Sequence, residues 1–229
     1  MIKSRITLAG ALLAVAGAAN AGFSVTPTVT SDYDWRGITQ TQEDPAFQLG
    51  VNWTHDSGFY LGAWGSNVDF GPGDPSVEVD LFGGFTGGDA TESFAYDVGV
   101  NYYTYMDAGS LNFVELYAGI TKGPFAAKLW FSPEFAGDGG KEEFYLEGNV
   151  TYPLPSGFSI LGHVGYSTGD GIKVYNGTDD SYLDYSAGVG YGFKNLNLNA
   201  KYVNSNDLNG PGRNAWIFSI STTLPWASE

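Results

Sequence analysis

Apolar and polar residues alternate along most of the chain that follows Ala21. Ten segments show this pattern clearly, beginning with Phe23–Thr30, Phe47–Thr54 and Val77–Thr86. A repeat of two residues predicts β-strands with one apolar and one polar face. Two further strands are expected near Phe59–Asp69 and Asn112–Thr121, where both faces are similarly apolar and the phase stays open. No stretch of useful length has the 3.6-residue repeat of a helix.

The length of the chain is consistent with about twelve strands, within a range of ten to fourteen. A tilted transmembrane strand takes roughly 10 residues, so twelve strands use about 120 residues of the segment 22–229. That leaves about 7 residues for each connection, which is an ordinary length. Eight strands would leave connections that are too long, and sixteen would leave too few residues for the visible loops.

The expected connections are sorted by length. Short turns are expected at Asp56–Gly58, Thr121–Gly123, Leu154–Gly157 and Lys194–Asn195, with a longer turn at Gly87–Ser93. Longer, more acidic loops alternate with them at Gln40–Pro45, Gly71–Ser76, Ala136–Lys141, Gly169–Ser181 and Asn206–Arg213. Short turns at one end and long loops at the other are typical of outer-membrane barrels.

The residue types on the two faces separate a membrane barrel from a secreted β-sandwich. The apolar face is almost free of charge, aromatic residues such as Trp53 and Phe135 gather at its strand ends, and glycine is dense on the polar face. Aromatic girdles belong to membrane barrels, and inward glycines relieve crowding in a narrow lumen. The predicted fold class is therefore all-β, a transmembrane antiparallel β-barrel formed by residues 22–229.

Residues 1–21 have the pattern of a cleaved signal peptide. Lys3 and Arg5 precede an apolar run, and Ala19-Asn20-Ala21 forms a small-residue cleavage site. The alternative is a membrane anchor, but the apolar run is shorter than the roughly 20 residues that span a bilayer. We therefore expect export through the periplasm.

Composition excludes several functions. The chain has 25 Asp and Glu against 10 Lys and Arg, so it lacks the basic face of a nucleic-acid binder. It has no Cys and two His, so neither a disulfide scaffold nor a transition-metal site is expected, and we expect no cofactor. No glycine string follows a strand and opens a helix, as nucleotide fingerprints do.

The polar face supplies candidate pore-lining residues. Projected inward, these are Asp32, Arg36, Glu78, Asp80, Asp97, Glu115, Lys128, Glu134, Glu143, Glu147, His163, Asp184 and Lys201. An acidic lumen raises the local concentration of cations and repels anions. Two alternatives stay open: the carboxylates could pair with Lys128, Lys201 or Arg36 in a closed polar plug, and Arg36 could be a pore latch or a structural ion pair.

One short segment raises the possibility of an enzyme: His55-Asp56-Ser57 fits the His-x-Ser string of outer-membrane lipid hydrolases, in which an imidazole activates a hydroxyl. The string lies in a short turn at the expected periplasmic end, whereas such hydrolysis takes place in the outer leaflet. Gly58 follows directly, so the segment is better explained as a tight turn. No catalytic residue is therefore predicted.

The segment Ser31–Phe85 carries a family resemblance. It begins S-D-Y-D-W-R-G-I-T-Q at Ser31–Gln40 and includes S-G-F-Y-L-G-A-W-G-S-N-V-D-F at Ser57–Phe70 and V-E-V-D-L-F-G-G-F at Val77–Phe85. This segment resembles the TorF-like porins, small outer-membrane β-barrels of Gram-negative bacteria. The resemblance implies location and architecture and supplies no catalytic residues. Such barrels commonly end on an aromatic residue read by the assembly machinery, whereas here Trp226 is followed by Ala227-Ser228-Glu229.

The sequence thus predicts a porin-like channel for passive diffusion of small solutes or ions, leaning toward cations. The alternative is a non-conducting barrel with a structural or surface-binding role, and a lipid hydrolase is the weaker alternative. Expected partners are outer-membrane lipids, the barrel assembly machinery and small solutes or cations, with no nucleic acid. The sequence leaves the oligomeric state open.

Overall fold

The structure, a computed structural model, describes residues 22–71, 73, 75–137, 139–177, 179–206 and 214–225. The expected signal peptide at 1–21 and Trp226 lie outside these residues.

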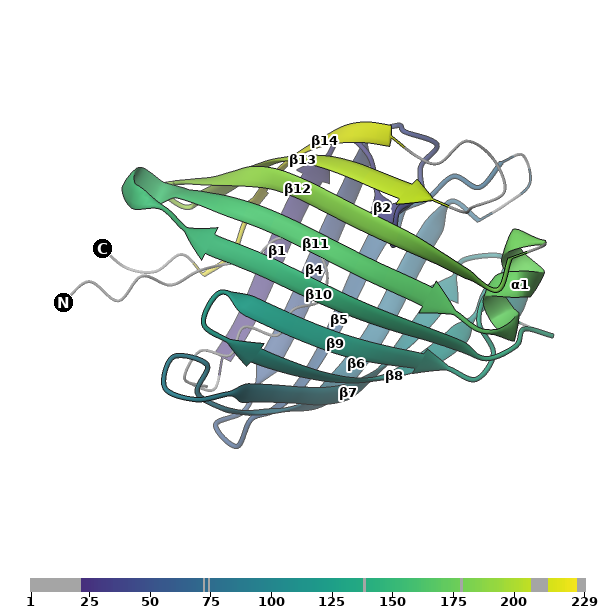
Figure 1. Cartoon of the computed structure of the whole chain (residues 1–229), viewed down its shortest axis with the longest axis horizontal. Helices are drawn as coiled ribbons and strands as arrows, with labels where there is room; N and C mark the ends of the chain where they lie inside the picture. The colour runs from purple at the N-terminus through teal and green to yellow at the C-terminus, as the bar shows by residue number, and fades with distance from the viewer. Residues whose placement is uncertain are drawn as a thin grey trace.

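Twelve antiparallel strands close into a single barrel (Figure 1). Each strand pairs with the next along the chain, and β1 closes the barrel by pairing with β4 on one side and β14 on the other. This confirms the predicted fold. The barrel strands are β1 (Gly22–Thr30), β4 (Ala46–Thr54), β5 (Phe59–Asn67), β6 (Val77–Gly88), β7 (Ala95–Tyr105), β8 (Phe113–Lys122), β9 (Phe125–Ser132), β10 (Glu143–Pro153), β11 (Phe158–Thr168), β12 (Ser181–Phe193), β13 (Leu196–Asn206) and β14 (Asn214–Thr222).

The apolar face of every barrel strand points outward. Large apolar side chains are exposed around the whole wall, among them Leu81 at 52% and Val189 at 54%. A soluble barrel or sandwich would bury such a surface, so the sandwich alternative does not describe this chain. The structure also shows which face points outward in the two strands whose phase the sequence left open. Leu61 on β5 and Leu116 on β8 point outward, and Glu115 is buried inside.

The two ends of the barrel differ in the length of their connections, as predicted. At the turn end the strands are joined by residues 55–58, 89–94, 123–124, 154–157 and 194–195, the fourth of which contains the 3₁₀ turn η2 (Pro155–Gly157). At the loop end the connections include residues 31–45, 68–76, 106–112, 133–142 and 169–180. The loop end also holds the 3₁₀ turn η1 (Gly109–Leu111) and the short helix α1 (Asp170–Asn176). Within the described residues, no helix is long and apolar enough to cross a membrane.

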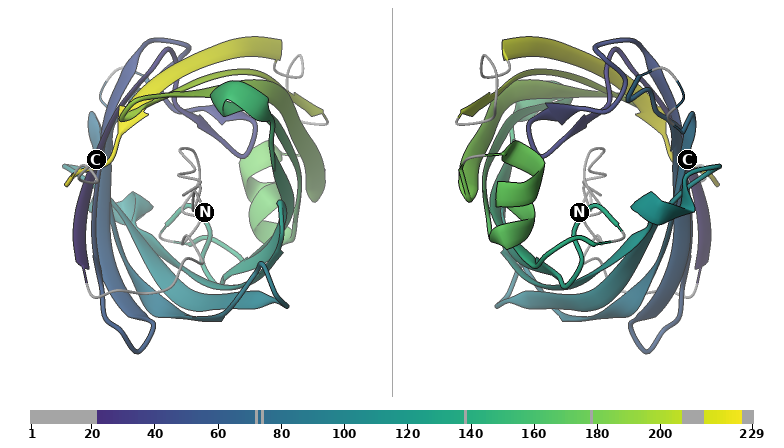
Figure 2. Two further views of the ribbon diagram at one scale, coloured as in Figure 1. Left: turned by 90° about the vertical axis from the view of Figure 1, so that its left-hand side faces the viewer. Right: turned by 90° about the vertical axis from the view of Figure 1, so that its right-hand side faces the viewer.

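The first loop is longer than predicted and folds into the barrel. Residues 31–45 contain a small hairpin of β2 (Asp34–Trp35) and β3 (Ile38–Thr39), which projects into the opening of the barrel in Figure 2. The turn between them consists of Arg36 and Gly37, both at positive φ (51° and 75°). This is the backbone shape that tightly twisted two-residue hairpin turns require. Arg36 is therefore a turn residue inside the lumen and does not belong to the barrel wall.

Candidate functional site: the barrel lumen

The hairpin of residues 31–45, called the lumen hairpin below, contacts several sides of the barrel wall. The hydroxyl of Tyr33 donates a hydrogen bond to Glu78 Oε1 on β6 at 3.0 Å. Across the lumen, Ser205 Oγ on β13 donates to the carbonyl of Gly37 at 2.8 Å. The hairpin therefore reaches from the β6 side of the wall to the β13 side and narrows the loop end of the lumen.

An apolar cluster holds the lumen hairpin in place. The ring of Trp35 stacks on Phe135 with a centroid distance of 5.9 Å, and it meets Phe113 edge-on at 6.4 Å. The same cluster includes Ile172 of α1, which is fully buried, and Tyr182 of β12. The loop helix and the hairpin thus share one core inside the mouth of the barrel.

Arg36 joins the tip of the lumen hairpin to two strands of the wall. Its Nη2 lies 2.8 Å from Glu115 Oε2 on β8, and its Nη1 lies 2.8 Å from Glu143 Oε2 on β10. All three side chains are buried, at 7%, 0% and 1% exposure. Burial alone would lower the pKa of Arg36, but the two carboxylates outweigh it and raise the pKa above its usual value. Arg36 is therefore a charged latch between the hairpin and the wall.

A row of aromatic rings on the inner wall lies next to the Arg36 side chain. Tyr117 on β8, Trp130 on β9 and Tyr145 on β10 are paired across neighbouring strands and form one buried cluster. The Arg36 guanidinium lies 4.2 Å from the ring centroid of Tyr145 and 5.8 Å from that of Trp130. Cation–π attraction therefore adds to the ion pairs that hold the latch.

A second cation lies on the other side of the aromatic row. Lys128 Nζ on β9 is 2.8 Å from Asp97 Oδ2 and lies 4.3 Å from the ring centroid of Tyr117 and 5.0 Å from that of Trp130. The indole N–H of Trp130 donates to Glu147 Oε1 at 2.8 Å. The row thus has a tethered cation on each side and carboxylates around its edge.

Histidine and further carboxylates extend the network along β10 to β12. His163 Nε2 lies 2.7 Å from Asp184 Oδ1 and 3.0 Å from the hydroxyl of Tyr145, and its Nδ1 lies 2.8 Å from Asn149 Oδ1.

In the lumen hairpin, burial raises the pKa of Asp34 to about 6, although the nearby Lys201 acts in the opposite direction.

Nearly all of the predicted pore-lining residues face the lumen. Asp32, Arg36, Glu78, Asp80, Glu115, Lys128, Glu143, Glu147 and Asp184 are buried, whereas Asp97, His163 and Lys201 are partly exposed within the barrel. Glu134 is the exception: it is exposed in the loop after β9, because the strand ends at Ser132. Arg36 and Lys128 pair with carboxylates, as the alternative of a polar plug anticipated.

Sequence reasoning placed the aromatic residues mainly on the outer face and so missed those inside. Tyr33, Trp35, Tyr103, Tyr145 and Trp130 all lie in the lumen, and Phe135, expected at the end of an outward row, is buried against Trp35. The signal was present, because Trp130 and Tyr145 fall on the same alternation as Lys128 and Glu147.

Inward glycines make room for these rings. A Cβ on Gly99 would lie 2.5 Å from Tyr117 Cζ, and one on Gly84 would lie 2.6 Å from the Tyr60 hydroxyl. Real Cβ atoms do not approach other atoms so closely, so both positions need glycine. This supports the expectation that glycine relieves crowding in the lumen.

The His55-Ser57 string is found where the sequence placed it, in the turn between β4 and β5. His55 Nδ1 lies 2.9 Å from Ser57 Oγ, but the backbone N–H of Ser57 also donates to the same nitrogen at 3.1 Å. Both residues are exposed at the turn end. The contact is a local turn interaction.

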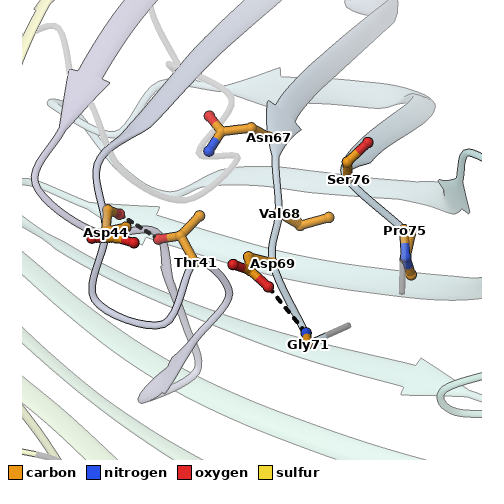
Figure 3. A pocket seen from close by; sticks show the side chains of 8 residues that line it. All are labelled: Thr41, Asp44, Asn67, Val68, Asp69, Gly71, Pro75 and Ser76. Atoms are coloured by element: carbon orange, nitrogen blue, oxygen red, sulfur yellow. Dashed lines mark hydrogen bonds between the residues drawn. The ribbon is translucent and has the colours of Figure 1, made fainter. Parts of the chain in front are cut away.

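A separate pocket of about 430 Å³ opens at the loop end, between the base of the lumen hairpin and the β5–β6 loop (Figure 3). Thr41 Oγ1 donates to the carbonyl of Asp44 at 2.6 Å, and Asp69 Oδ1 accepts from the N–H of Gly71 at 3.0 Å. Each of these bonds lies within one wall of the pocket, and Gln42 Nε2, which donates to Asp69 Oδ1 at 2.6 Å, joins the two walls. Within the described residues, no cluster of His, Asp and Glu is suited to hold a metal ion.

A closed barrel of twelve antiparallel strands, apolar outside and polar inside, has the fold of the outer-membrane porins. The chain belongs to the family described as bacterial protein of unknown function (Gcw_chp), whose model matches residues 15–215. A search of curated proteins finds no match to this chain.

Among solved structures, the chain is similar to the KdgM porin, with 13% identity and a TM-score of 0.58 over 87% of this chain and 98% of that one. The NanC porin matches with 10% identity and a TM-score of 0.57 over 88% and 99% of the two chains. A structure of the KdgM porin in complex with disordered oligogalacturonate matches with 10% identity and a TM-score of 0.56, covering 87% and 97%. At these identities the likeness is one of fold.

Proposed function

We propose that this chain is a porin-like channel for passive diffusion of small solutes or ions, with a constriction formed by the lumen hairpin. The observation that carries the proposal is the charged interior of the barrel. Ionic groups such as Arg36 and Glu115 are costly to bury, and a barrel with a purely structural role would be more stable with apolar residues inside. Asp97, His163 and Lys201 keep exposed surface inside the barrel, as expected of a lumen that admits water and solutes.

We further propose that the channel leans toward cations. The charged side chains that face the lumen are mostly carboxylates, namely Asp32, Asp34, Glu78, Asp80, Asp97, Glu115, Glu143, Glu147 and Asp184, against Arg36, Lys128 and Lys201. Such a lumen attracts cations and repels anions. For the same reason oligogalacturonate, a carboxylate sugar oligomer bound by the KdgM porin, is a poor candidate for this chain.

The proposed location is the outer membrane of a Gram-negative bacterium. The chain would be exported through the periplasm, lose residues 1–21 by cleavage, and be inserted by the barrel assembly machinery. The outward apolar band would contact outer-membrane lipids. Within the outer-membrane porins, we propose that the chain belongs with the TorF-like porins, which the segment Ser31–Phe85 resembles. No chemical step is proposed.

A non-conducting barrel is the second candidate, and the buried network at the loop end favours it. Glu78, Glu115 and Glu143 are almost fully buried there, so the lumen hairpin fills much of the cross-section. Planar-bilayer recording of the refolded protein in a KCl gradient separates the two candidates. Single-channel steps whose reversal potential indicates preference for K⁺ support the cation-leaning channel. Folded protein that gives no steps supports the non-conducting barrel, and a Cl⁻ preference contradicts the proposed selectivity.

A further inference from the structure

The contacts of Arg36 have the composition of a recognition site for an organic cation. Two buried carboxylates, Glu115 and Glu143, bind the two terminal nitrogens, each at 2.8 Å. The guanidinium also lies 4.2 Å from the ring centroid of Tyr145 and 4.5 Å from that of Trp35. Carboxylates that accept hydrogen bonds from the terminal nitrogens, together with rings that cover the guanidinium, are the contacts that bind guanidinium groups.

Lys128, on the neighbouring part of the inner wall, has the same kinds of contact, a carboxylate and aromatic rings. A carboxylate, Asp97, lies at 2.8 Å, and the rings of Tyr117 and Trp130 lie at 4.3 and 5.0 Å. Trp130 is near both cations, so its ring joins the two positions. The inner wall of β8, β9 and β10 therefore offers two neighbouring cation positions, each filled by a side chain of the protein.

The position that Arg36 occupies, between Glu115 and Glu143, can accept a further hydrogen-bond donor. Glu115 has no exposed surface, and among the described residues its Oε1 atom is buried without a hydrogen-bond partner. A buried carboxylate oxygen without a donor costs free energy, which a further N–H donor would recover. Around the aromatic row, Glu115, Glu143, Glu147 and Asp97 outnumber the two tethered cations, so a further positive charge is favoured.

We propose that this wall binds the guanidinium or primary ammonium group of small organic cations and that Arg36 occupies the first position as a tethered mimic of the ligand. This inference rests on the proposed channel function and names the class of solute that the channel takes. A solute of this class would enter by replacing Arg36 between Glu115 and Glu143 and would then meet the aromatic row.

The test uses the variant Arg36→Ala, which vacates the first position, with free guanidinium as the probe. In planar bilayers, guanidinium chloride at millimolar concentrations is expected to block the current of this variant, whereas urea, a neutral molecule of the same shape, is not. Adding Glu115→Gln to the variant is expected to weaken the block by about tenfold or more, because a charge-assisted hydrogen bond is lost. Glu92→Gln, which removes an exposed carboxylate from the turn after β6, is the matched control and is expected to leave the block unchanged.

Equal block by guanidinium and urea, or a block that Glu115→Gln does not weaken, would overturn the inference. Calorimetric titration of the folded Arg36→Ala variant in detergent with guanidinium measures binding without any need for conduction. Binding in a barrel that does not conduct contradicts the channel but supports the site. Conduction without guanidinium binding supports the channel and rejects the site.

Discussion

Gly37, at the tip of the lumen hairpin, is packed against Asp184 on β12 with no room for a side chain. A Cβ on Gly37 would lie 2.7 Å from the Cβ of Asp184 and 2.7 Å from that of Ser205. Gly37 also has a φ of +75°, which residues with a side chain rarely adopt. The docked position of the hairpin therefore depends on the absence of a side chain at this one residue.

Replacing Gly37 with valine is expected to undock the lumen hairpin and to increase the conductance of the barrel. The valine side chain would overlap the wall at β12 and β13, so the tip can no longer seat between Asp184 and Ser205. Gly123→Val is the matched control, because Gly123 also has a positive φ (+55°) but no atom within 4 Å of the added Cβ. Single-channel recording checks the prediction, and equal conductance of the two folded variants would contradict it.

The stability of hairpin docking is expected to fall as the pH rises from about 4 to about 6. Burial raises the pKa of Asp34 to about 6, above its ordinary value of about 4. The docked hairpin is thus favoured while Asp34 is protonated, and this contribution, at most about 3 kcal/mol, is lost as Asp34 ionises. Recordings across this range are expected to show longer open times at the higher pH.

Asp34→Asn isolates this contribution from that of the other carboxylates in the lumen. Asparagine keeps the size of the side chain and does not ionise, so the variant is expected to have a smaller change in open time between pH 4 and 6 than the parent protein. Identical pH profiles of the two proteins would show that Asp34 plays no part.

Charge on the outer wall is expected to destabilise the barrel in a bilayer according to depth. Leu129 lies near the middle of β9 and is 45% exposed, whereas Phe125 begins the same strand at the turn end. Leu129→Arg is expected to lower the free energy of unfolding by about 2–4 kcal/mol and Phe125→Arg by about 0–1 kcal/mol. Urea unfolding in liposomes, followed by Trp fluorescence, measures both values. Equal effects would be inconsistent with a lipid-facing wall.

Removal of a lumen cation is expected to increase the preference for cations. Lys201 lies on the inner wall of β13 and is partly buried, whereas Lys122 is exposed at the turn end of β8. Lys201→Gln is expected to raise the permeability ratio of K⁺ to Cl⁻, and Lys122→Gln to leave it near the parent value, because only the first charge lies on the solute path. Reversal potentials in a KCl gradient give both ratios, and a change at Lys122 alone would argue against the assigned path.

The sequence was sufficient to predict the barrel because strand alternation is a local signal. It assigned Glu143, Glu147 and Lys128 to one face, and the length of the chain gave the number of strands. The lumen hairpin depends on contacts between residues far apart in the chain, such as Arg36 and Glu143, separated by 107 positions. Alternation along a strand says which face a wall residue takes, but it does not say which loop folds inward. For the same reason the cluster of Trp35 and Phe135 was not foreseen.

The most direct test of the proposed channel replaces residues 32–44, which make up nearly all of the lumen hairpin, by a short Gly-Ser turn. Because Thr30 pairs directly with Ala46, β1 and β4 can be joined by such a turn without disturbing the barrel. Single-channel recording of this variant beside the parent protein is expected to give a several-fold larger conductance in the variant. The same conductance in both folded proteins would contradict a constriction formed by the lumen hairpin, and no conductance in either would contradict the channel.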